Sequence, residues 1–279
     1  MFCRLADYVQ LTLPPAFGTA YVGETFSCTL CANNELLDTQ DARVVSSVRI
    51  TAEMQTPSQT LPLELTPPDE DTSSSGLKPQ QSLQQIVRFD LKEEGNHILT
   101  VSANYSETSI SVKDNSAASG RVRTFRKLYQ FIAQPCLGVR TKTSELPPAE
   151  VQDPEQPSEK ARLQRYALEA QLENLAEGSI TLQRVSLEPK PPFKSTSING
   201  DMVPDGLEKL DLPKLAPHDV WQVAFLLEQQ KEDLDGSETV RKSLSKDGRA
   251  VLGQLTIQWR SNMGDPGMLS TGWLTTRRR

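Results

Sequence analysis

The chain has 279 residues, a hydrophobic content of 37% and a formal net charge of −6. At about 100–150 residues per domain this length allows two domains, each large enough to fold around its own core without disulfides or metal. The acidic balance argues against nucleic acid as a partner, because phosphate binding needs clustered basic residues, and the one cluster, Arg277, Arg278 and Arg279, is interpreted as a solvated tail.

Alternating apolar and polar residues predict several half-buried strands in the first half of the chain. Between positions 44 and 54 the even positions form the apolar face, from Val44 through Ile50 to Met54. Further strands are predicted over 8–13, 26–32, 83–91, 97–105 and 121–133. Glu94, Gly95 and Asn96 predict a turn between two of them, because glycine and asparagine tolerate positive φ.

The second half shows the same alternation, with one ambiguous segment. Residues 166–173 are rich in alanine, leucine, glutamine and glutamate, which are good helix formers, but their period of two favours a strand. Further strands are predicted over 179–188, 220–227 and 251–259, and the segment 268–275 closes the chain after a turn at 262–267.

The fold class expected from this pattern is all-β, with two tandem immunoglobulin-like β-sandwiches and long polar loops. The expected domains are residues 1–134 and 135–279. Low-complexity composition predicts a disordered insertion at about 56–82 in the first domain, and loops at about 146–160, 189–217 and 229–248 in the second. Such segments bury too little apolar area to offset the entropy of ordering.

Few residues carry the signature of an enzyme or metal site. The two histidines are His97, on the apolar face of a predicted strand, and His218, in a predicted loop; neither lies beside a nucleophile motif. Cys28 and Cys31 form a lone Cys-x-x-Cys within a strand, where positions three apart point to opposite faces. We therefore expect Cys28 in the core, Cys31 as a surface thiol, and no metal or redox site.

Phosphate-binding glycine loops are absent from the sequence, and the acidic runs 69–71 and 232–233 lie in segments with no rigid frame. The prediction is no catalytic, cofactor-binding or metal residues, no cofactor and no enzymatic activity. The N-terminus lacks the pattern of a secretory signal, and no stretch approaches the ~20 apolar residues of a membrane helix. A cytoplasmic location without a transmembrane segment is expected.

Five segments together carry a family resemblance. Segment 15–34 contains Tyr-Val-Gly-Glu-Thr-Phe, and segment 94–105 reads Glu-Gly-Asn-His-Ile-Leu-Thr-Val-Ser-Ala-Asn-Tyr. The others are 125–131 leading into 139–143, 168–174 with 185–189, and 253–264 with 267–274. In this order the set resembles the trafficking protein particle (TRAPP) complex subunit 13 family, and it spans most of the chain outside the predicted loops.

The resemblance implies a fungal member of the family and an accessory, non-catalytic subunit of a vesicle-tethering complex at ER-Golgi and Golgi membranes. The implied partners are other TRAPP subunits, with a Rab GTPase reached indirectly through the complex core, which activates it. Family members carry more residues upstream of Gly-Glu-Thr-Phe and a further C-terminal β-domain, so an incomplete chain is expected. The segment 56–82 is an insertion relative to the family.

Three other classes of β-sandwich protein are distinguished by the sequence features they require. An extracellular adhesion domain would have a signal peptide and a paired-cysteine bridge. A β-sandwich glycosidase would have convergent carboxylates on rigid strand ends. Neither pattern is found in the sequence. A cytosolic arrestin-like cargo adaptor matches fold and location equally well, so it remains the alternative, separated from a tethering subunit only by its partners.

Overall fold

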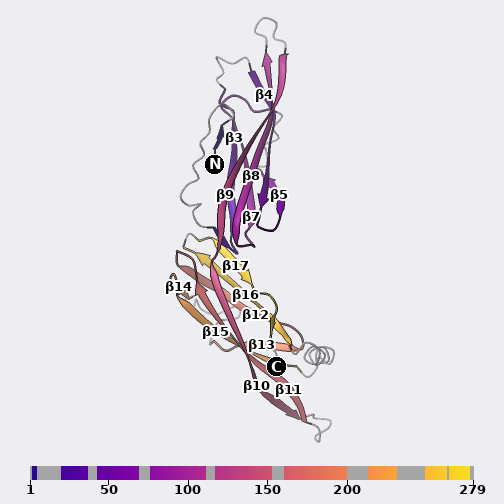
Figure 1. Cartoon of the computed structure of the whole chain (residues 1–279), viewed down its shortest axis with the longest axis vertical. Helices are drawn as coiled ribbons and strands as arrows, with labels where there is room; N and C mark the ends of the chain where they lie inside the picture. The colour runs from indigo at the N-terminus through magenta and orange to yellow at the C-terminus, as the bar shows by residue number, and fades with distance from the viewer. Residues whose placement is uncertain are drawn as a thin grey trace. The chain divides into compact units, whose positions relative to one another are not determined.

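The computed structural model describes residues 2–4, 20–36, 43–68, 76–110, 117–152, 160–199, 213–230, 249–262 and 264–276. Across these residues the regular structure is entirely β, which confirms the predicted all-β class (Figure 1). Among them no helix is long and apolar enough to cross a membrane. The chain divides into two compact units, Met1–Gln134 and Pro135–Arg279. The predicted strand at 8–13 and the terminal arginines lie outside the described residues.

The first unit contains two sheets. One has the order β1-β3-β7-β6, and the other has the order β2-β9-β8-β4-β5. The strands of the first sheet are β1 (Phe2–Arg4), β3 (Thr25–Asn33), β7 (Ser82–Asp90) and β6 (Leu65–Thr66). Those of the second are β2 (Ala20–Val22), β9 (Ala117–Pro135), β8 (Gly95–Ile110), β4 (Arg43–Gln55) and β5 (Thr60–Leu63).

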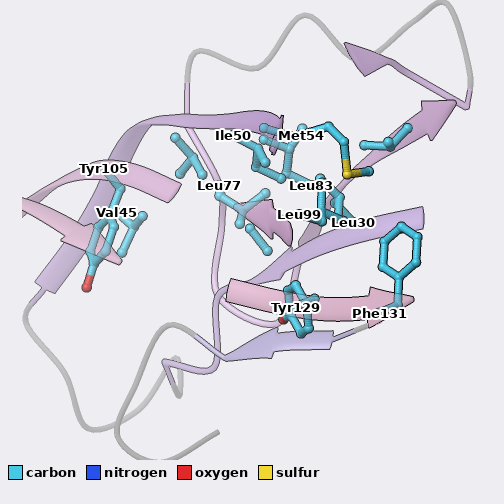
Figure 2. Packing of buried hydrophobic residues seen from close by; sticks show 14 of the residues in the cluster. Leu30, Val45, Ile50, Met54, Leu77, Leu83, Leu99, Tyr105, Tyr129 and Phe131 are labelled. Atoms are coloured by element: carbon cyan, nitrogen blue, oxygen red, sulfur yellow. The ribbon is translucent and has the colours of Figure 1, made fainter. Parts of the chain in front are cut away.

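Side chains from both sheets form one hydrophobic core in this unit (Figure 2). Met54 and Leu99 are fully buried within it, and each contributes about 1.5–3 kcal/mol relative to an exposed side chain. Phe26 stacks on Phe131 with ring centroids 5.0 Å apart. The period-two patterns of β3, β4, β7, β8 and β9 supply these residues, so burial of one face of each strand holds the two sheets together.

The apolar face predicted for 44–54 is correct for only part of β4. Ile50, Ala52 and Met54 are buried as expected, but at the start of the strand Val45 is buried and Val44 is exposed. The ladder between β4 and β8 shifts register between Ser46 and Arg49. A β-bulge places an extra residue in one strand and exchanges the two faces beyond it.

The second unit also contains two sheets. One has the order β10-β11-β15-β13, with β10 (Leu137–Gln152), β11 (Lys160–Asn174), β15 (Val220–Gln229) and β13 (Phe193–Ser197). The other has the order β14-β12-β16-β17, with β14 (Lys214–Leu215), β12 (Ile180–Pro189), β16 (Val251–Ser261), β17 (Pro266–Ser270) and β18 (Leu274–Thr275), the last also paired with β16. Segment 166–173 lies in β11, which confirms a strand.

Fully buried side chains of this unit again come from alternate positions. Leu168 and Leu172 of β11, Leu227 of β15, and Leu255 and Trp259 of β16 are completely inaccessible to solvent. Opposite charges face each other across the long β10–β11 hairpin on its exposed side, with Arg140 near Glu173. Such exposed pairs contribute little, about 0–1 kcal/mol, so apolar burial dominates the stability of the unit.

Three of the segments predicted as disordered or as loops contain regular structure. The segment 56–82 includes β5 and β6, and its Leu77 is buried. The β10–β11 hairpin extends to Gln152 and resumes at Lys160, within the predicted loop 146–160, and 189–217 includes β13 and β14. These strands form because neighbouring strands pair with their backbones, which composition does not reveal. Of the predicted loop 229–248, residues 231–248 lie outside the described residues.

Candidate interaction surface

The two histidines have structural surroundings. His97 is fully buried, and its ring stacks on Phe131 with centroids 5.5 Å apart. Its Nδ1 lies 3.0 Å from the carbonyl oxygen of Gly95. His218 has a positive φ of 66° and donates its backbone N–H to the carbonyl of Asn174 at 2.8 Å. The interpretation of His97 as a core residue is confirmed.

The prediction of a surface thiol at Cys31 is wrong. Cys31 is 7% exposed, and its neighbours Leu30 and Ala32 on the core side are buried too. Both faces of β3 are therefore covered at this point, which alternation alone cannot reveal. Cys28 is half-buried, and this burial raises the pKa of its thiol to about 11. Both thiols are free, and protonation leaves Cys28 unreactive near neutral pH. No group of three possible metal ligands occurs in the described parts of the chain.

The strongest candidate for an interaction surface is the outward side of β9. We call the outward side chains Val122, Arg126, Leu128 and Ile132 the β9 face. The three aliphatic residues are 78%, 61% and 54% exposed. Ile98 of β8 pairs with Gln130, so it lies diagonally beside Leu128 and Ile132 and extends the aliphatic area. Several exposed aliphatics on one strand face are typical of an interaction surface.

The strand that carries this face is basic. β9 contains Arg121, Arg123, Arg126 and Lys127 and no acidic residue. Of these only Arg126 lies on the outward side, because the other three occupy odd positions, like the core-side Phe125 and Tyr129. On the outward side of the adjacent strand β4, Arg49 and Glu53 are both exposed, and their opposite charges offset each other. The β9 face is therefore mainly aliphatic, with Arg126 as its one cation.

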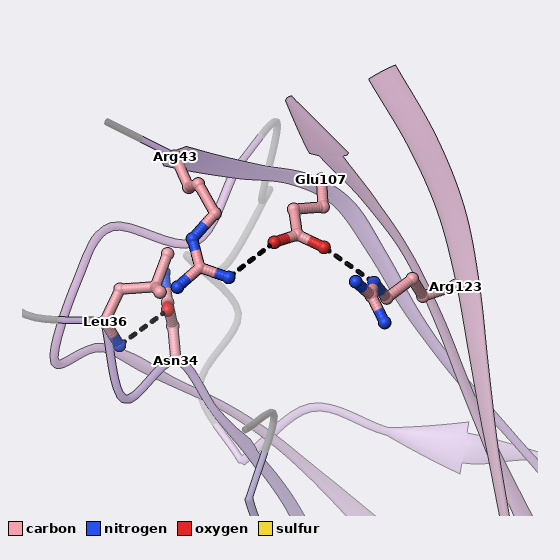
Figure 3. A network of polar contacts seen from close by, with 5 residues as sticks. All are labelled: Asn34, Leu36, Arg43, Glu107 and Arg123. Atoms are coloured by element: carbon pink, nitrogen blue, oxygen red, sulfur yellow. Dashed lines mark hydrogen bonds and ion pairs between the residues drawn. The ribbon is translucent and has the colours of Figure 1, made fainter. Parts of the chain in front are cut away.

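A polar network fixes the end of the sheet where the β9 face begins (Figure 3). Arg43 Nη1 donates to Glu107 Oε1 at 3.0 Å, and Arg123 Nε donates to Glu107 Oε2 at 2.6 Å. The Glu107 side chain is only 12% exposed. Burial opposes ionisation of this carboxyl, but the two guanidinium groups outweigh it and lower its pKa. The network joins β4, β8 and β9, and it lies on the core side of the sheet, next to Tyr105 and Phe125, rather than on the β9 face.

Replacing Glu107 by glutamine should lower the free energy of unfolding by about 1 kcal/mol at pH 7, because two charge-assisted bonds are lost. A carboxyl whose folded-state pKa is lowered stabilises the fold above its ordinary value of 4.5, and this contribution disappears as pH falls below that value. The difference between the two proteins should therefore shrink below pH 4.5. Urea unfolding from pH 7 to pH 3.5 measures it, and a difference independent of pH would contradict the assigned role.

The sequence signal for the β9 face is the presence of apolar residues on both sides of one strand. Phe125, Tyr129 and Phe131 mark the inward side of the strand, and all three lie on the core side. The apolar residues at even positions, Val122 and Ile132 among them, are out of phase with this pattern. Apolar residues on both sides of a strand indicate either burial on both sides or an exposed contact surface, and only the sheet order distinguishes the two.

Two family models match the sequence. The model of the N-terminal part of trafficking protein particle complex subunit 13 matches residues 5–133, and the model of its middle domain matches residues 139–278. The chain belongs to the trafficking protein particle complex subunit 13 family. The two matched regions correspond to the two compact units, so both units derive from the family.

Curated relatives carry the same name. The subunit 13 proteins of Danio rerio and Pongo abelii are each 28% identical to this chain over 95% of its length, which is 55% and 56% of theirs. A probable Drosophila melanogaster homologue is 27% identical over 97% of this chain and 53% of its own. The chain therefore spans about half the length of the relatives it matches. Among solved structures, the secreted serine protease VesC from Vibrio cholerae matches 76% of this chain and 44% of its own, with 10% identity and a TM-score of 0.25.

Proposed function

We propose that the chain acts as a non-catalytic structural subunit of the TRAPP complex in ER-Golgi and Golgi traffic, and supports activation of a Rab GTPase by the complex core. Its location is cytoplasmic and peripheral to those membranes, through the complex. The observation that carries this proposal is the family match over both units rather than one. The relatives are named as subunits of a complex, which supports a role through protein contacts.

Within this proposal each unit is an immunoglobulin-like sandwich. In such folds the first, second, fifth and fourth strands form one sheet, and the third, sixth and seventh form the other. In the first unit the seven strands in chain order are β1, β3, β4, β6, β7, β8 and β9. Their sheet orders, β1-β3-β7-β6 and β9-β8-β4, follow this rule. In the second unit the seven strands are β10, β11, β12, β13, β15, β16 and β17. Their orders, β10-β11-β15-β13 and β12-β16-β17, follow the rule as well. Sandwiches of this kind present flat faces and strand edges, both suited to protein contacts.

The proposed contact is the β9 face, docked against an apolar surface of a neighbouring subunit. Leu128 and Ile132 supply the apolar centre of the contact, and Arg126 lies between Val122 and Leu128 on the same side of the strand. A stable interface buries about 800 Å² on each partner, with a few central residues providing most of the free energy. Aliphatic side chains on a rigid strand are suited to that central role.

The test is affinity purification of the tagged chain from cells that contain the complex, with the other subunits quantified by mass spectrometry. A variant with Leu128→Asp and Ile132→Asp should recover about tenfold less of them, because charges replace the apolar centre. The matched control is Ile198→Asp with Val220→Asp, two aliphatics in the second unit, each 56% exposed. This control should recover the subunits as the unchanged chain does.

Other outcomes contradict parts of the proposal. Because the relatives are about twice as long, the purification is repeated with a chain extended to their full length. Failure of the extended chain to recover TRAPP subunits would contradict a role in the complex. Recovery of membrane-cargo tails instead would favour the arrestin-like adaptor. Equal losses in the β9 variant and its control would place the contact elsewhere on the molecule.

A further inference from the structure

A surface concavity of about 420 Å³ lies on the first unit, and no residue of the β9 face lines it. It is bounded by β5, the end of β7 and the turns next to them, which lie close together (Figure 1). We call it the β5–β7 concavity. Its lining residues are Thr56, Gln59, Leu61, Arg88, Phe89, Asp90, Lys92 and Glu93.

The concavity exists because the chain crosses from one sheet to the other. β5 pairs with β4 as far as Leu63, and β6 pairs with β7 from Leu65 onwards, so Glu64 alone joins the two sheets. The ladder between β6 and β7 therefore ends at the pair Leu65–Val87. Beyond it, no strand in the described part of the chain pairs with residues 88–90 on that side.

The backbone of Asp90 faces this gap. Leu91 N–H donates to the carbonyl of Glu24 at 3.0 Å, so Leu91 faces the β3 side. At the other end of β7, the carbonyl of Gln81 accepts from Asn34 N–H at 2.9 Å on the same side. Because alternate residues of an antiparallel strand direct their backbone groups to opposite neighbours, Asp90 directs its N–H and C=O away from β3. The gap thus offers a backbone donor and a backbone acceptor.

The concavity is lined by two cations, Arg88 and Lys92, and by two carboxylates, Asp90 and Glu93. Glu93 is already engaged, because Ser58 donates its backbone N–H and its hydroxyl to the Glu93 carboxylate at 3.1 and 2.5 Å. These bonds lower the pKa of Glu93, so its carboxylate stays charged but is held by Ser58. Asp90 accepts a bond from Thr25 at 2.7 Å. Arg88 and Lys92 are exposed and have no ion pair with any residue that the structure describes.

The opposite wall limits which edge a ligand can use. Pro62 lies in β5 and has no N–H, so it weakens the free edge of that strand as a template for pairing. Half-buried Leu61 and Phe89 provide the apolar part of the lining. An incoming strand can therefore pair with β7 at Asp90 and place an apolar side chain against Leu61 and Phe89.

We propose that the β5–β7 concavity binds an extended acidic peptide segment of a partner polypeptide, which adds to β7 beside residues 88–90 in line with β6. Main-chain bonds to an exposed strand supply affinity in this mode of recognition, and side-chain contacts supply specificity. Here Arg88 and Lys92 select a carboxylate, and Leu61 with Phe89 accepts an aliphatic side chain. The site is independent of the β9 face and of membership in a particular complex.

The test selects binders from a library of random linear peptides on the purified chain. The selected peptides should be enriched in Asp or Glu next to β-branched residues. A synthetic copy of the best peptide should bind at least ~tenfold more weakly to the Arg88→Glu, Lys92→Glu variant, because like charges then face each other. The matched control, Arg49→Glu with Lys78→Glu, reverses two exposed cations of the same unit and should bind normally. Hydrogen exchange should show slower exchange at the Asp90 amide in the bound state.

Two results would overturn the proposal. One is a selection that yields no peptide whose binding depends on Arg88 and Lys92. The other is a bound peptide that leaves the exchange of residues 88–90 unchanged, since strand addition must protect the Asp90 amide. Circular dichroism of both variants confirms that the fold is intact, because these side chains are exposed and charge reversal there removes no core contact.

Discussion

Replacing Asn174 by alanine should lower the free energy of unfolding of the second unit by at least about 3 kcal/mol. The side chain is fully buried, and its Nδ2 donates to the carbonyls of Gly178 and Leu215 at 2.9 and 3.1 Å. Its Oδ1 accepts from the N–H of Ala176 at 3.0 Å. Alanine leaves all three backbone groups without these partners, and each buried unsatisfied group costs about 1–3 kcal/mol.

Tryptophan fluorescence during urea unfolding measures this effect in the right part of the chain. All three tryptophans, Trp221, Trp259 and Trp273, lie in the second unit. The control is Gln171→Ala, which removes an exposed amide from the same strand and should change stability by less than about 0.5 kcal/mol. A loss below about 1 kcal/mol for Asn174→Ala would show that water or rearrangement satisfies the exposed backbone groups.

Asn34 makes the same arrangement in the first unit. It is buried, its Nδ2 donates to the carbonyl of Leu77 at 2.8 Å, and its Oδ1 accepts from Leu36 N–H at 3.2 Å. In both units the asparagine comes at or just after the end of a strand, and it is bonded to a residue that precedes the strand paired with its own: Leu77 precedes β7, and Leu215 precedes β15. The equivalent bonds indicate that the two units repeat one structural device.

The repeated segments show why this device escapes a search for repeats. Leu-Lys-Pro-Gln-Gln at 77–81 corresponds to Leu-Ala-Pro-His-Asp at 215–219. Gln80 and His218 both have positive φ, 60° and 66°, and both donate their backbone N–H to the carbonyl of the respective asparagine at 2.8 Å. Only leucine and proline are shared in sequence. Backbone geometry and hydrogen bonds define the equivalence, and these depend on the fold rather than on residue identity.

The difference between local sequence pattern and tertiary structure also explains which features the sequence could predict. Strands such as β7, β8 and β16 can be predicted because apolar and polar residues alternate along them. The burial of Val45 in place of Val44 cannot be predicted in this way, because a β-bulge depends on pairing with another strand. Likewise β5 and β6 have no strong alternation, and they form because β4 and β7 pair with them. The β9 face and the β5–β7 concavity depend on sheet order and on the crossing at Glu64, so neither was predictable from local pattern.

Replacing Gly267 by alanine should destabilise the second unit by about 2–3 kcal/mol. Gly267 of β17 is buried and pairs with Trp259 of β16, which is fully buried. A Cβ at this position would lie 2.5 Å from Nε1 of Trp259 and overlap Cε2 and Cζ2 of the same ring. A buried indole in a packed core cannot move aside, and overpacking of this kind costs about 1–3 kcal/mol.

A matched glycine and a double-mutant cycle separate this clash from a general effect of glycine replacement. At Gly272 a Cβ would meet no other atom within 4 Å, and the backbone there has no positive φ, so Gly272→Ala should change stability by less than about 0.5 kcal/mol. Leucine at position 259 lacks the ring that meets the new Cβ. In the Trp259→Leu background, Gly267→Ala should therefore cost at least about 1 kcal/mol less than in the unchanged protein. Equal costs in both backgrounds would locate the strain in the backbone of β17 rather than in its contact with Trp259.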